Sequence, residues 1–192
     1  YFFMPQRPTV PTRLETSRLI LRCPELSDVP FDYQAVKESL KELKPWMPWA
    51  TDDYTLESCE ENIRSAIARY ITKENFRMSF FDKQTNRLLG SSGFPRVDWN
   101  IPRFEIGYWC RSSETGKGYV TEVVQALTKV AFETLNAARV EIRCDDLNVK
   151  SAGVAERCGF VLEGVLKNNE RNPKGELRST RIYGLTRFVD LK

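Results

Sequence analysis

The hydrophobic and polar positions along the chain follow two periods, one typical of strands and one typical of helices. Short apolar runs bounded by turn residues predict strands over residues 19–23, 76–81, 88–97, 103–110, 139–144, 160–166 and 179–187. Apolar residues spaced three and four apart predict helices over residues 31–43, 55–72, 117–135 and 151–158. A proline-containing lead-in is expected to be extended over residues 1–13, and a polar loop is expected over residues 167–178.

The order of these elements predicts one mixed α/β domain. Three consecutive strands, followed by a strand–helix–strand unit, indicate a mixed sheet with helices on its faces. This order differs from the doubly wound order of dinucleotide-binding domains, which argues against an oxidoreductase of that kind. A length of 192 residues suits a single domain, so we expect one domain over residues 1–192. Met4 is a candidate native start, with residues 1–3 as an addition in front of it.

Composition narrows the classes of function. The 29 basic and 26 acidic residues give a net charge of +3, which is too balanced to favour a nucleic-acid partner. No apolar run reaches the length of about 18 residues that a membrane-spanning helix needs. The five cysteines are widely spaced, which favours reduced thiols in a cytoplasmic protein over disulfides or a metal site. The sequence contains no histidine, so a glutamate is the natural candidate for a general base.

A loop with two glycines lies between a predicted strand and a predicted helix, over residues 115–120. The first N–H groups of a helix have no intrahelical acceptor, and the helix dipole favours negative charge there. Gly116 and Gly118 place no Cβ between the backbone and a ligand. The loop therefore predicts a site for a phosphorylated ligand.

Several motifs lie in order along nearly the whole chain, at residues 14–22, 46–49, 105–109, 116–122, 148–151, 159–160 and 163–164. Together they resemble the GNAT superfamily of N-acetyltransferases, and especially its branch of bacterial ribosomal-protein N-terminal acetyltransferases. The resemblance implies a mostly antiparallel sheet of about seven strands with helices on both faces, and acetyl-CoA as the cofactor. It implies that the cofactor is bound by Tyr108, Trp109, Cys110, Arg111, Thr115, Gly116, Lys117, Gly118, Tyr119, Val120, Asn148 and Ser151.

Two positions of the glycine loop depart from the family pattern. Thr115 replaces a Gln or Arg, and Val120 replaces a small residue. Because backbone donors do not depend on side chains, the amides of residues 115–120 are still expected to hold the CoA pyrophosphate. The resemblance also implies that strand residues 108–111 pair with the pantetheine arm and that Asn148 hydrogen-bonds the cofactor.

Acetyl transfer to an amine needs a base for the amine and can use an acid for the departing thiolate. Family members often carry a glutamate at the position of Glu105, which shares a strand face with Trp109. The ribosomal branch implies a second candidate base, Glu170. The structural alternatives are an ion pair of Glu105 with Arg96 or Arg103, and a solvated loop carboxylate at position 170.

The candidate acid follows from the same branch. Ser151 matches its proton donor, although this serine is also a candidate cap for the helix that it opens. Most other branches carry a tyrosine four residues further on, where this chain has Ala155. A tyrosine acid at that position is therefore excluded.

The acceptor that the branch resemblance favours is the α-amine of a protein N-terminus, whose pKa near 8 lets a weak base suffice. Trp46, Trp49 and Trp99 are candidates for lining the acceptor cleft. Direct transfer in a ternary complex fits the family better than an acyl intermediate on Cys110. A small-molecule amine as acceptor and a catalytically silent acyl-CoA-binding regulatory module stay open as alternatives. We expect a monomer or homodimer with no nucleic-acid or membrane partner.

Overall fold

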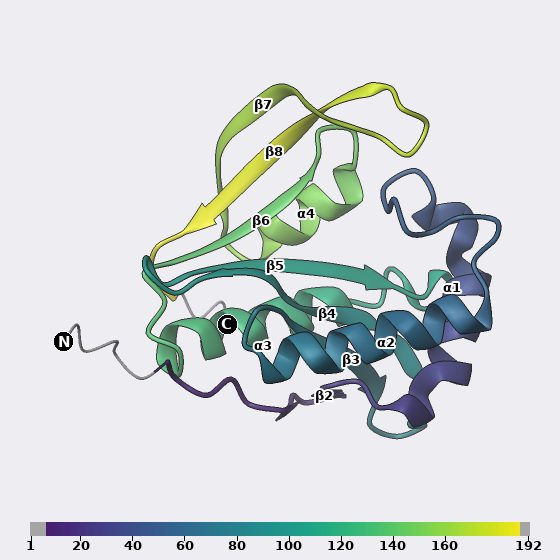
Figure 1. The fold of residues 1–192 in the computed structure, drawn as a ribbon. Coiled ribbons are helices and arrows are strands. Elements are labelled where there is room, and N and C mark those ends of the chain that lie inside the picture. Colours follow the sequence, from purple (N-terminus) through teal and green to yellow (C-terminus); the bar gives the residue numbers. More distant parts are fainter. Residues whose placement is uncertain (1–6, 189–192) are drawn as a thin grey trace.

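One mixed sheet organises the computed structural model, which describes residues 7–188 (Figure 1). Its strands are β1 (Arg13–Glu15), β2 (Leu19–Arg22), β3 (Phe76–Asp82), β4 (Leu88–Asp98), β5 (Arg103–Cys110), β6 (Arg139–Asp145), β7 (Val161–Arg171) and β8 (Leu177–Leu185). Their spatial order is β1-β2-β3-β4-β5-β6-β8-β7, and only β5 and β6 pair in parallel among these strands. The predicted mixed, mostly antiparallel sheet is confirmed, with one edge strand more than expected because β1 is too short for its apolar pattern to show.

Helices cover both faces of the sheet, as predicted (Figure 1). The helices α1 (Val29–Leu43) and α2 (Leu56–Ile71) lie on one face, and α3 (Tyr119–Glu133) and α4 (Val149–Arg157) lie on the other. A capping box starts α2, since Thr55 Oγ1 accepts from the Ser58 N–H (3.2 Å) and Ser58 Oγ accepts from the Thr55 N–H (3.0 Å). Asn148 caps α4 by accepting from the Ser151 N–H (3.1 Å).

Apolar side chains form two buried cores, one on each face of the sheet. Successive residues of β5 point to opposite faces. Phe104 and Ile106 therefore join the core under α3 and α4, where Leu127 is fully buried. Trp109 instead joins the core under α1 and α2, together with Ile63. This alternation agrees with the face assignment predicted for the strand, and it orients every side chain of β5 discussed below.

The centre of the sheet opens where β5 and β6 diverge (Figure 1). The two strands pair only over residues 103–105 of β5 and 139–141 of β6. Beyond this point β5 stays with β4 as far as the pair Cys110–Gly90, and β6 stays with β8 as far as the pair Asp145–Thr180. Each strand therefore presents an unpaired backbone edge to the gap between them, which is where an extended ligand can add hydrogen bonds.

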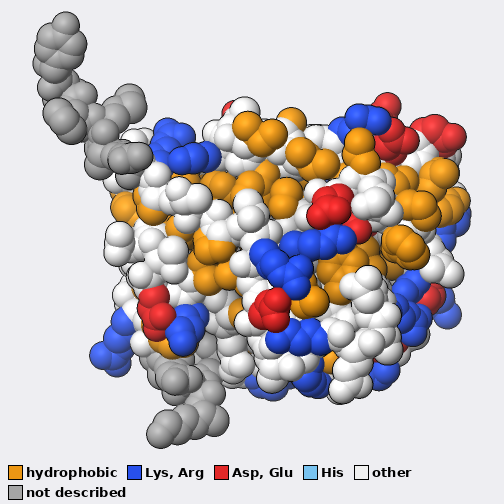
Figure 2. Space-filling model, turned by 90° about the horizontal axis from the view of Figure 1, so that it is seen from below, with side chains coloured by type: hydrophobic (Ala, Val, Ile, Leu, Met, Phe, Trp, Pro, Cys, Tyr) orange, Lys and Arg blue, Asp and Glu red, His pale blue; other side chains and the backbone are white. Residues whose placement is uncertain are grey.

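Charged side chains of both signs lie interspersed with apolar ones on the face seen in Figure 2. That face carries no large area of one sign, in agreement with the small net charge of +3. Across residues 7–188, none of the helices is both long enough and apolar enough to cross a bilayer.

Three expectations about the elements need correction or limitation. Residues 167–178 are not a loop, because β7 continues to Arg171 and β8 begins at Leu177, which leaves only a short turn between them. Both strands are largely exposed here, so no apolar alternation marks them in the sequence.

The helix α3 begins at residue 119 rather than 117, and α4 begins at 149 rather than 151. The proposed start at Met4 and the first six residues of the extended lead-in lie outside the described residues.

Candidate active site

A cavity of about 220 Å³ lies at the divergence of β5 and β6. Its wall brings together five residues that were predicted to be catalytic or to bind the cofactor, namely Glu105, Tyr108, Asn148, Ser151 and Glu170. These residues come from two strands of the sheet centre and edge and from the start of α4. Residues that are spread over 66 positions of the sequence, from 105 to 170, therefore lie together at one site where β5 and β6 diverge.

The cavity has two chemically different ends. Even-numbered residues of β5 and β6, such as Ile106 and Ile142, point to the face of α3 and α4, where Ser151 also lies. Odd-numbered residues, such as Glu105 and Arg143, point to the other face. The gap between the strands therefore connects a hydroxyl-bearing end with a carboxylate-bearing end.

Glu105 combines burial with an ion pair. Its carboxylate Oε2 lies 3.1 Å from Nη1 of Arg96, a side chain that is 65% exposed. Arg103, the other predicted partner, lies 3.6 Å from Asp98 instead. Burial raises the pKa of Glu105, although the nearby cations Arg96 and Arg143 oppose this shift. A carboxylate with a raised pKa is a better proton acceptor, so this geometry suits a general base as well as a structural pair.

Glu170 lies on strand β7 and not in a loop. Its Oε2 accepts a hydrogen bond from Nη2 of Arg178 on β8 (2.7 Å), directly across the pair of strands. The same guanidinium lies 3.7 Å from Asp145, at the end of β6. Arg178 therefore fixes Glu170 at the wall of the cavity, and the expectation of a solvated loop carboxylate is wrong.

Ser151 does not cap α4, because Asn148 fills that role. Its hydroxyl instead donates to the phenolic oxygen of Tyr108 (3.1 Å), and the Tyr108 hydroxyl donates to the Ser151 carbonyl oxygen (2.9 Å). Burial raises the pKa of Tyr108, which keeps this phenol protonated at neutral pH. The hydroxyl of Ser151 is thus free of helix capping and is held at the cavity by a neutral partner.

The glycine loop provides a run of unused backbone donors. Within residues 7–188, the N–H groups of residues 116–121 have no hydrogen-bond acceptor, and the first amide of α3 with a partner is that of Glu122, which donates to Gly118 (3.1 Å). Both loop glycines have φ of +79°, and a Cβ at Gly116 would meet no atom within 4 Å. The amide of Thr115, in contrast, donates to the Ser112 carbonyl (3.4 Å). These groups fit a pyrophosphate, with the available donors starting at residue 116 rather than 115.

The edge of β5 that faces the gap fits an extended, amide-containing ligand. The Arg111 N–H donates to the Leu89 carbonyl (2.7 Å), on the side of β4. Because backbone groups alternate sides along a strand, those of Tyr108 and Cys110 face β6, where the ladder has ended. The loop amides and the free edge of β5 therefore fit the pyrophosphate and the arm of a CoA molecule, which is the arrangement that the resemblance predicts.

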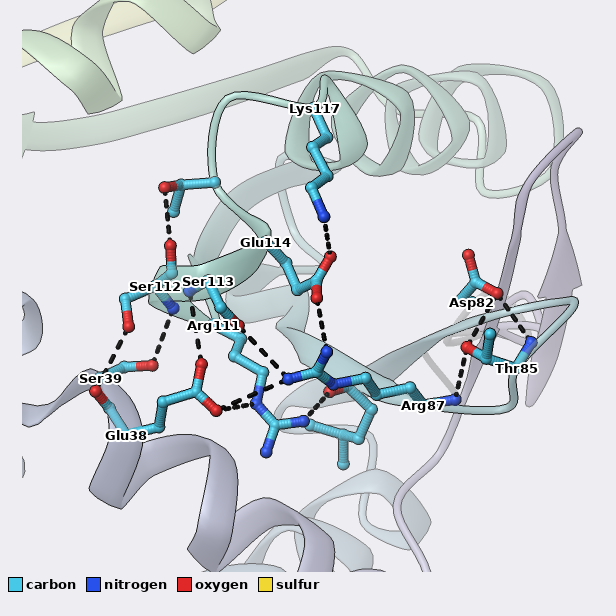
Figure 3. Close-up of polar contacts among 12 residues, drawn as sticks. Glu38, Ser39, Asp82, Thr85, Arg87, Arg111, Ser112, Ser113, Glu114 and Lys117 are labelled. Atoms are coloured by element: carbon cyan, nitrogen blue, oxygen red, sulfur yellow. Dashed lines mark hydrogen bonds and ion pairs between the residues drawn. The ribbon is translucent and has the colours of Figure 1, made fainter.

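Arg111 and Lys117, which the resemblance assigns to the cofactor, have side chains that contact other groups of the protein (Figure 3). Arg111 is buried and donates to the Leu88 carbonyl (3.2 Å), while its Nε forms an ion pair with Glu38 of α1 (2.9 Å). Lys117 donates to Glu114 (2.8 Å), and this hydrogen bond raises the pKa of the lysine. Their neighbours Ser39, Ser112, Ser113 and Arg87 complete a polar network between α1 and the segment that leads into the glycine loop. These residues therefore position the loop.

The predicted aromatic lining is correct in part. Trp46 lines the cavity of the site, and Trp49 lines a neighbouring cavity of about 340 Å³ together with Tyr54 and Trp109. Trp99 does not line the cleft, because it is partly buried at the edge of the core, where it packs edge-to-face against Phe76 and Phe104. Its position in a polar loop sequence concealed that burial.

Cys110 is a poor candidate for a covalent intermediate. Burial raises the pKa of its thiol to about 12, so the reactive thiolate is scarce at neutral pH. The geometry agrees with the preference for direct transfer.

Two arginines of the cavity, Arg143 and Arg178, were not predicted. Nothing in their local sequence separates them from solvated arginines of exposed strands. Arg178 could have been found only through its pairing with Glu170 across the unpredicted part of the β7–β8 hairpin.

The chain matches the family model described as "Acetyltransferase (GNAT) domain" over residues 18–161. The protein therefore belongs to the GNAT family of N-acetyltransferases, which use acetyl-CoA as the acetyl donor, and the resemblance seen in its motifs is confirmed.

Individual relatives agree with this assignment. The ribosomal-protein-serine acetyltransferase of Escherichia coli (strain K12) is 29% identical over 129 residues, which cover 66% of this chain and 72% of that protein. The N-acetyltransferase p20 of Bacillus licheniformis is 33% identical over 109 residues, or 57% of this chain, and the match spans 61% of that relative.

Solved structures share the fold over almost their whole length. A ribosomal L7/L12 α-N-protein acetyltransferase in complex with coenzyme A is 25% identical with a TM-score of 0.83, covering 92% of this chain and 97% of that one. The microcin C7 self-immunity acetyltransferase in complex with acetyl-CoA and AMP has a TM-score of 0.86 at 23% identity, covering 94% and 99%, and shows the fold alone.

Proposed function

We propose that this protein transfers an acetyl group from acetyl-CoA to the α-amine of a protein N-terminus, by direct attack in a ternary complex. The observation that carries the proposal is that one cavity, at the divergence of β5 and β6, has Glu105 and Glu170 at one end and Ser151 at the other. The ribosomal-protein acetyltransferases among its relatives support a protein N-terminus as the acceptor.

In this proposal the amine loses its proton at one end of the cavity, and the departing thiolate is protonated at the other. Bound acetyl-CoA supplies an activated acetyl thioester. Glu105 or Glu170 takes the proton of the acceptor amine, and the raised pKa of Glu105 favours it for this role. An α-amine has a pKa near 8, so about a tenth of it is already neutral at pH 7 and a modest base is enough. Ser151 holds a hydroxyl proton at the opposite end, where the family resemblance places the departing thiol.

The cofactor arm is assigned to backbone groups. The free amides of residues 116–121 would hold the pyrophosphate, and the free edge of β5 at Tyr108 and Cys110 would pair with the amides of the pantetheine arm. Asn148 uses its side-chain oxygen to cap α4, which leaves its amide nitrogen for the cofactor. A cytoplasmic location and a monomeric or homodimeric state belong to the same proposal, and five free cysteines accord with the former.

The test follows thiol release from acetyl-CoA with peptides that carry free Ser, Ala or Met N-termini, beside polyamines and free amino acids. We expect turnover on peptides, a loss of about 10²–10⁴-fold in kcat for the substitution of the true base among Glu105→Gln and Glu170→Gln, and a smaller loss for Ser151→Ala. Glu60→Gln, on the exposed face of α2, is the matched control and should retain full activity.

A second function, an acyl-CoA-binding regulatory module, is favoured by one observation. Both candidate bases form ion pairs, Glu105 with Arg96 (3.1 Å) and Glu170 with Arg178 (2.7 Å), so each carboxylate has a structural partner that it would keep in a protein without catalysis. Tight binding of acetyl-CoA without turnover on any acceptor, and without an effect of Glu105→Gln or Glu170→Gln, would establish this alternative and refute the transferase.

A further inference from the structure

Arg143, on strand β6, is a cation of the active-site cavity that has no carboxylate within ion-pair distance among the residues that the structure describes. Three arginines line this cavity. Arg96 pairs with Glu105 (3.1 Å) and Arg178 pairs with Glu170 (2.7 Å). Arg143 forms no ion pair within 4.0 Å and no side-chain hydrogen bond to any part of the chain that the structure describes, and its Nε is buried without a partner.

A buried guanidinium N–H without an acceptor is costly, and native proteins keep few of them. Arg143 lies two residues beyond Glu141, which pairs with Glu105 in the last step of the β5–β6 ladder. It therefore stands where the gap begins, on the same face as Glu105. A ligand that enters this end of the cavity would meet a carboxylate and an unpaired guanidinium together.

We infer that Arg143 hydrogen-bonds an oxygen next to the acceptor amine, so that the acceptor is an α-amino carbonyl compound. This inference rests on the proposed function and assigns a residue to the recognition of its acceptor. The amine is directed to Glu105 or Glu170, and the neighbouring carbonyl or carboxylate oxygen is directed to Arg143. A peptide N-terminus and a free amino acid both present this pair of groups.

The same charge disfavours polyamines. Their carbon chain offers no oxygen to Arg143, and a second ammonium group close to the reacting amine would be repelled by the unpaired guanidinium. The cavity should therefore discriminate by the group beside the amine, in addition to the amine itself.

The experiment compares two small acceptors of similar size, alaninamide and isopropylamine, of which only the first carries a carbonyl beside its amine. Arg143→Met removes the guanidinium and keeps much of the side-chain length, Arg143→Lys keeps a charge, and Arg64→Met on the exposed surface of α2 is the matched control. We expect Arg143→Met to lower kcat/KM for alaninamide about 10-fold or more, since hydrogen bonds to a charged group are strong. Its kcat/KM for isopropylamine and its KM for acetyl-CoA should change less than about twofold.

Free alanine and an alanine-initiated peptide are assayed beside alaninamide. Their comparison distinguishes a free amino acid from a peptide N-terminus as the source of the α-amino carbonyl group. Equal losses on alaninamide and isopropylamine, or no loss on either, would overturn the role of Arg143 while leaving the transferase intact. A wild-type preference for spermidine over every α-amino carbonyl acceptor would overturn it as well. If the wild type acetylates no amine, the proposed function is wrong, and this inference, which rests on it, is wrong as well.

Discussion

The pair of hydroxyls formed by Tyr108 and Ser151 gives a sharp test of how the acid end of the cavity is built. Tyr108→Phe removes one hydroxyl and keeps the ring packed. The lost phenol accepts from Ser151 Oγ (3.1 Å) and donates to the Ser151 carbonyl (2.9 Å), so the serine hydroxyl loses the contact that fixes its orientation. A neutral hydrogen bond contributes about 1 kcal/mol, which corresponds to about a fivefold change in rate. We therefore expect kcat to fall about 3- to 10-fold, with the KM for acetyl-CoA unchanged.

The double-mutant cycle with Ser151→Ala decides whether Tyr108 acts through the serine. If it does, Tyr108→Phe should change kcat by less than about 1.5-fold once Ser151 is alanine, because the partner that it orients is gone. Thiol release at saturating acetyl-CoA measures all four proteins, and thermal unfolding verifies that each is folded. A full fivefold loss in the Ser151→Ala background would refute the reasoning, since the tyrosine would then act on its own.

Three further predictions follow from buried groups of the site. Arg111→Met should lower the free energy of unfolding by about 2–3 kcal/mol, or Tm by roughly 5–10 °C in a thermal melt, because it breaks a buried ion pair. The loss is limited because the partner, Glu38, is partly exposed to solvent. A shift in Tm below about 2 °C would contradict this prediction. The raised pKa of Glu105 means that ionising this carboxyl destabilises the folded state. The destabilisation is absent at low pH and develops as the pH rises through the folded-state pKa. Glu105→Gln should therefore raise Tm at pH 8 and leave it unchanged at pH 4. Cys110→Ala should keep more than half of the activity, and Cys110 should react slowly with iodoacetamide at pH 8, because burial raises its thiol pKa to about 12.

Local signals in the sequence were enough for most of the fold. The bounds of α2 were predicted within about a residue, because Thr55 and Ser58 form a cap that depends on four consecutive residues. The β3–β4 hairpin and β5 followed from apolar runs and turn residues in the same way. Where a motif marked a candidate residue, as at Glu105 and Ser151, the structure places that residue in the wall of the cavity.

The rest depended on contacts that no local pattern encodes. The β7–β8 hairpin is held in its exposed part by cross-strand contacts such as Glu170 with Arg178, so it carries no apolar alternation there. The contact of Tyr108 with Ser151 joins residues 43 apart in sequence, and only the divergence of β5 from β6 brings them together. The contacts of the Arg111 side chain with Glu38 and Leu88 could not be predicted either, because proximity to a motif along the chain says nothing about where a side chain points.

Glu122, in the first turn of α3, ties the glycine loop to the beginning of the chain. It accepts from Ser17 Oγ (3.1 Å), from the Arg18 N–H (3.0 Å) and from Arg18 Nε (2.7 Å), across more than 100 residues of sequence. Arg18 also donates to the Lys117 carbonyl inside the loop (2.9 Å). The shape of the loop that is proposed to hold the pyrophosphate therefore depends on how the chain enters β2, and not on the residues of the loop alone.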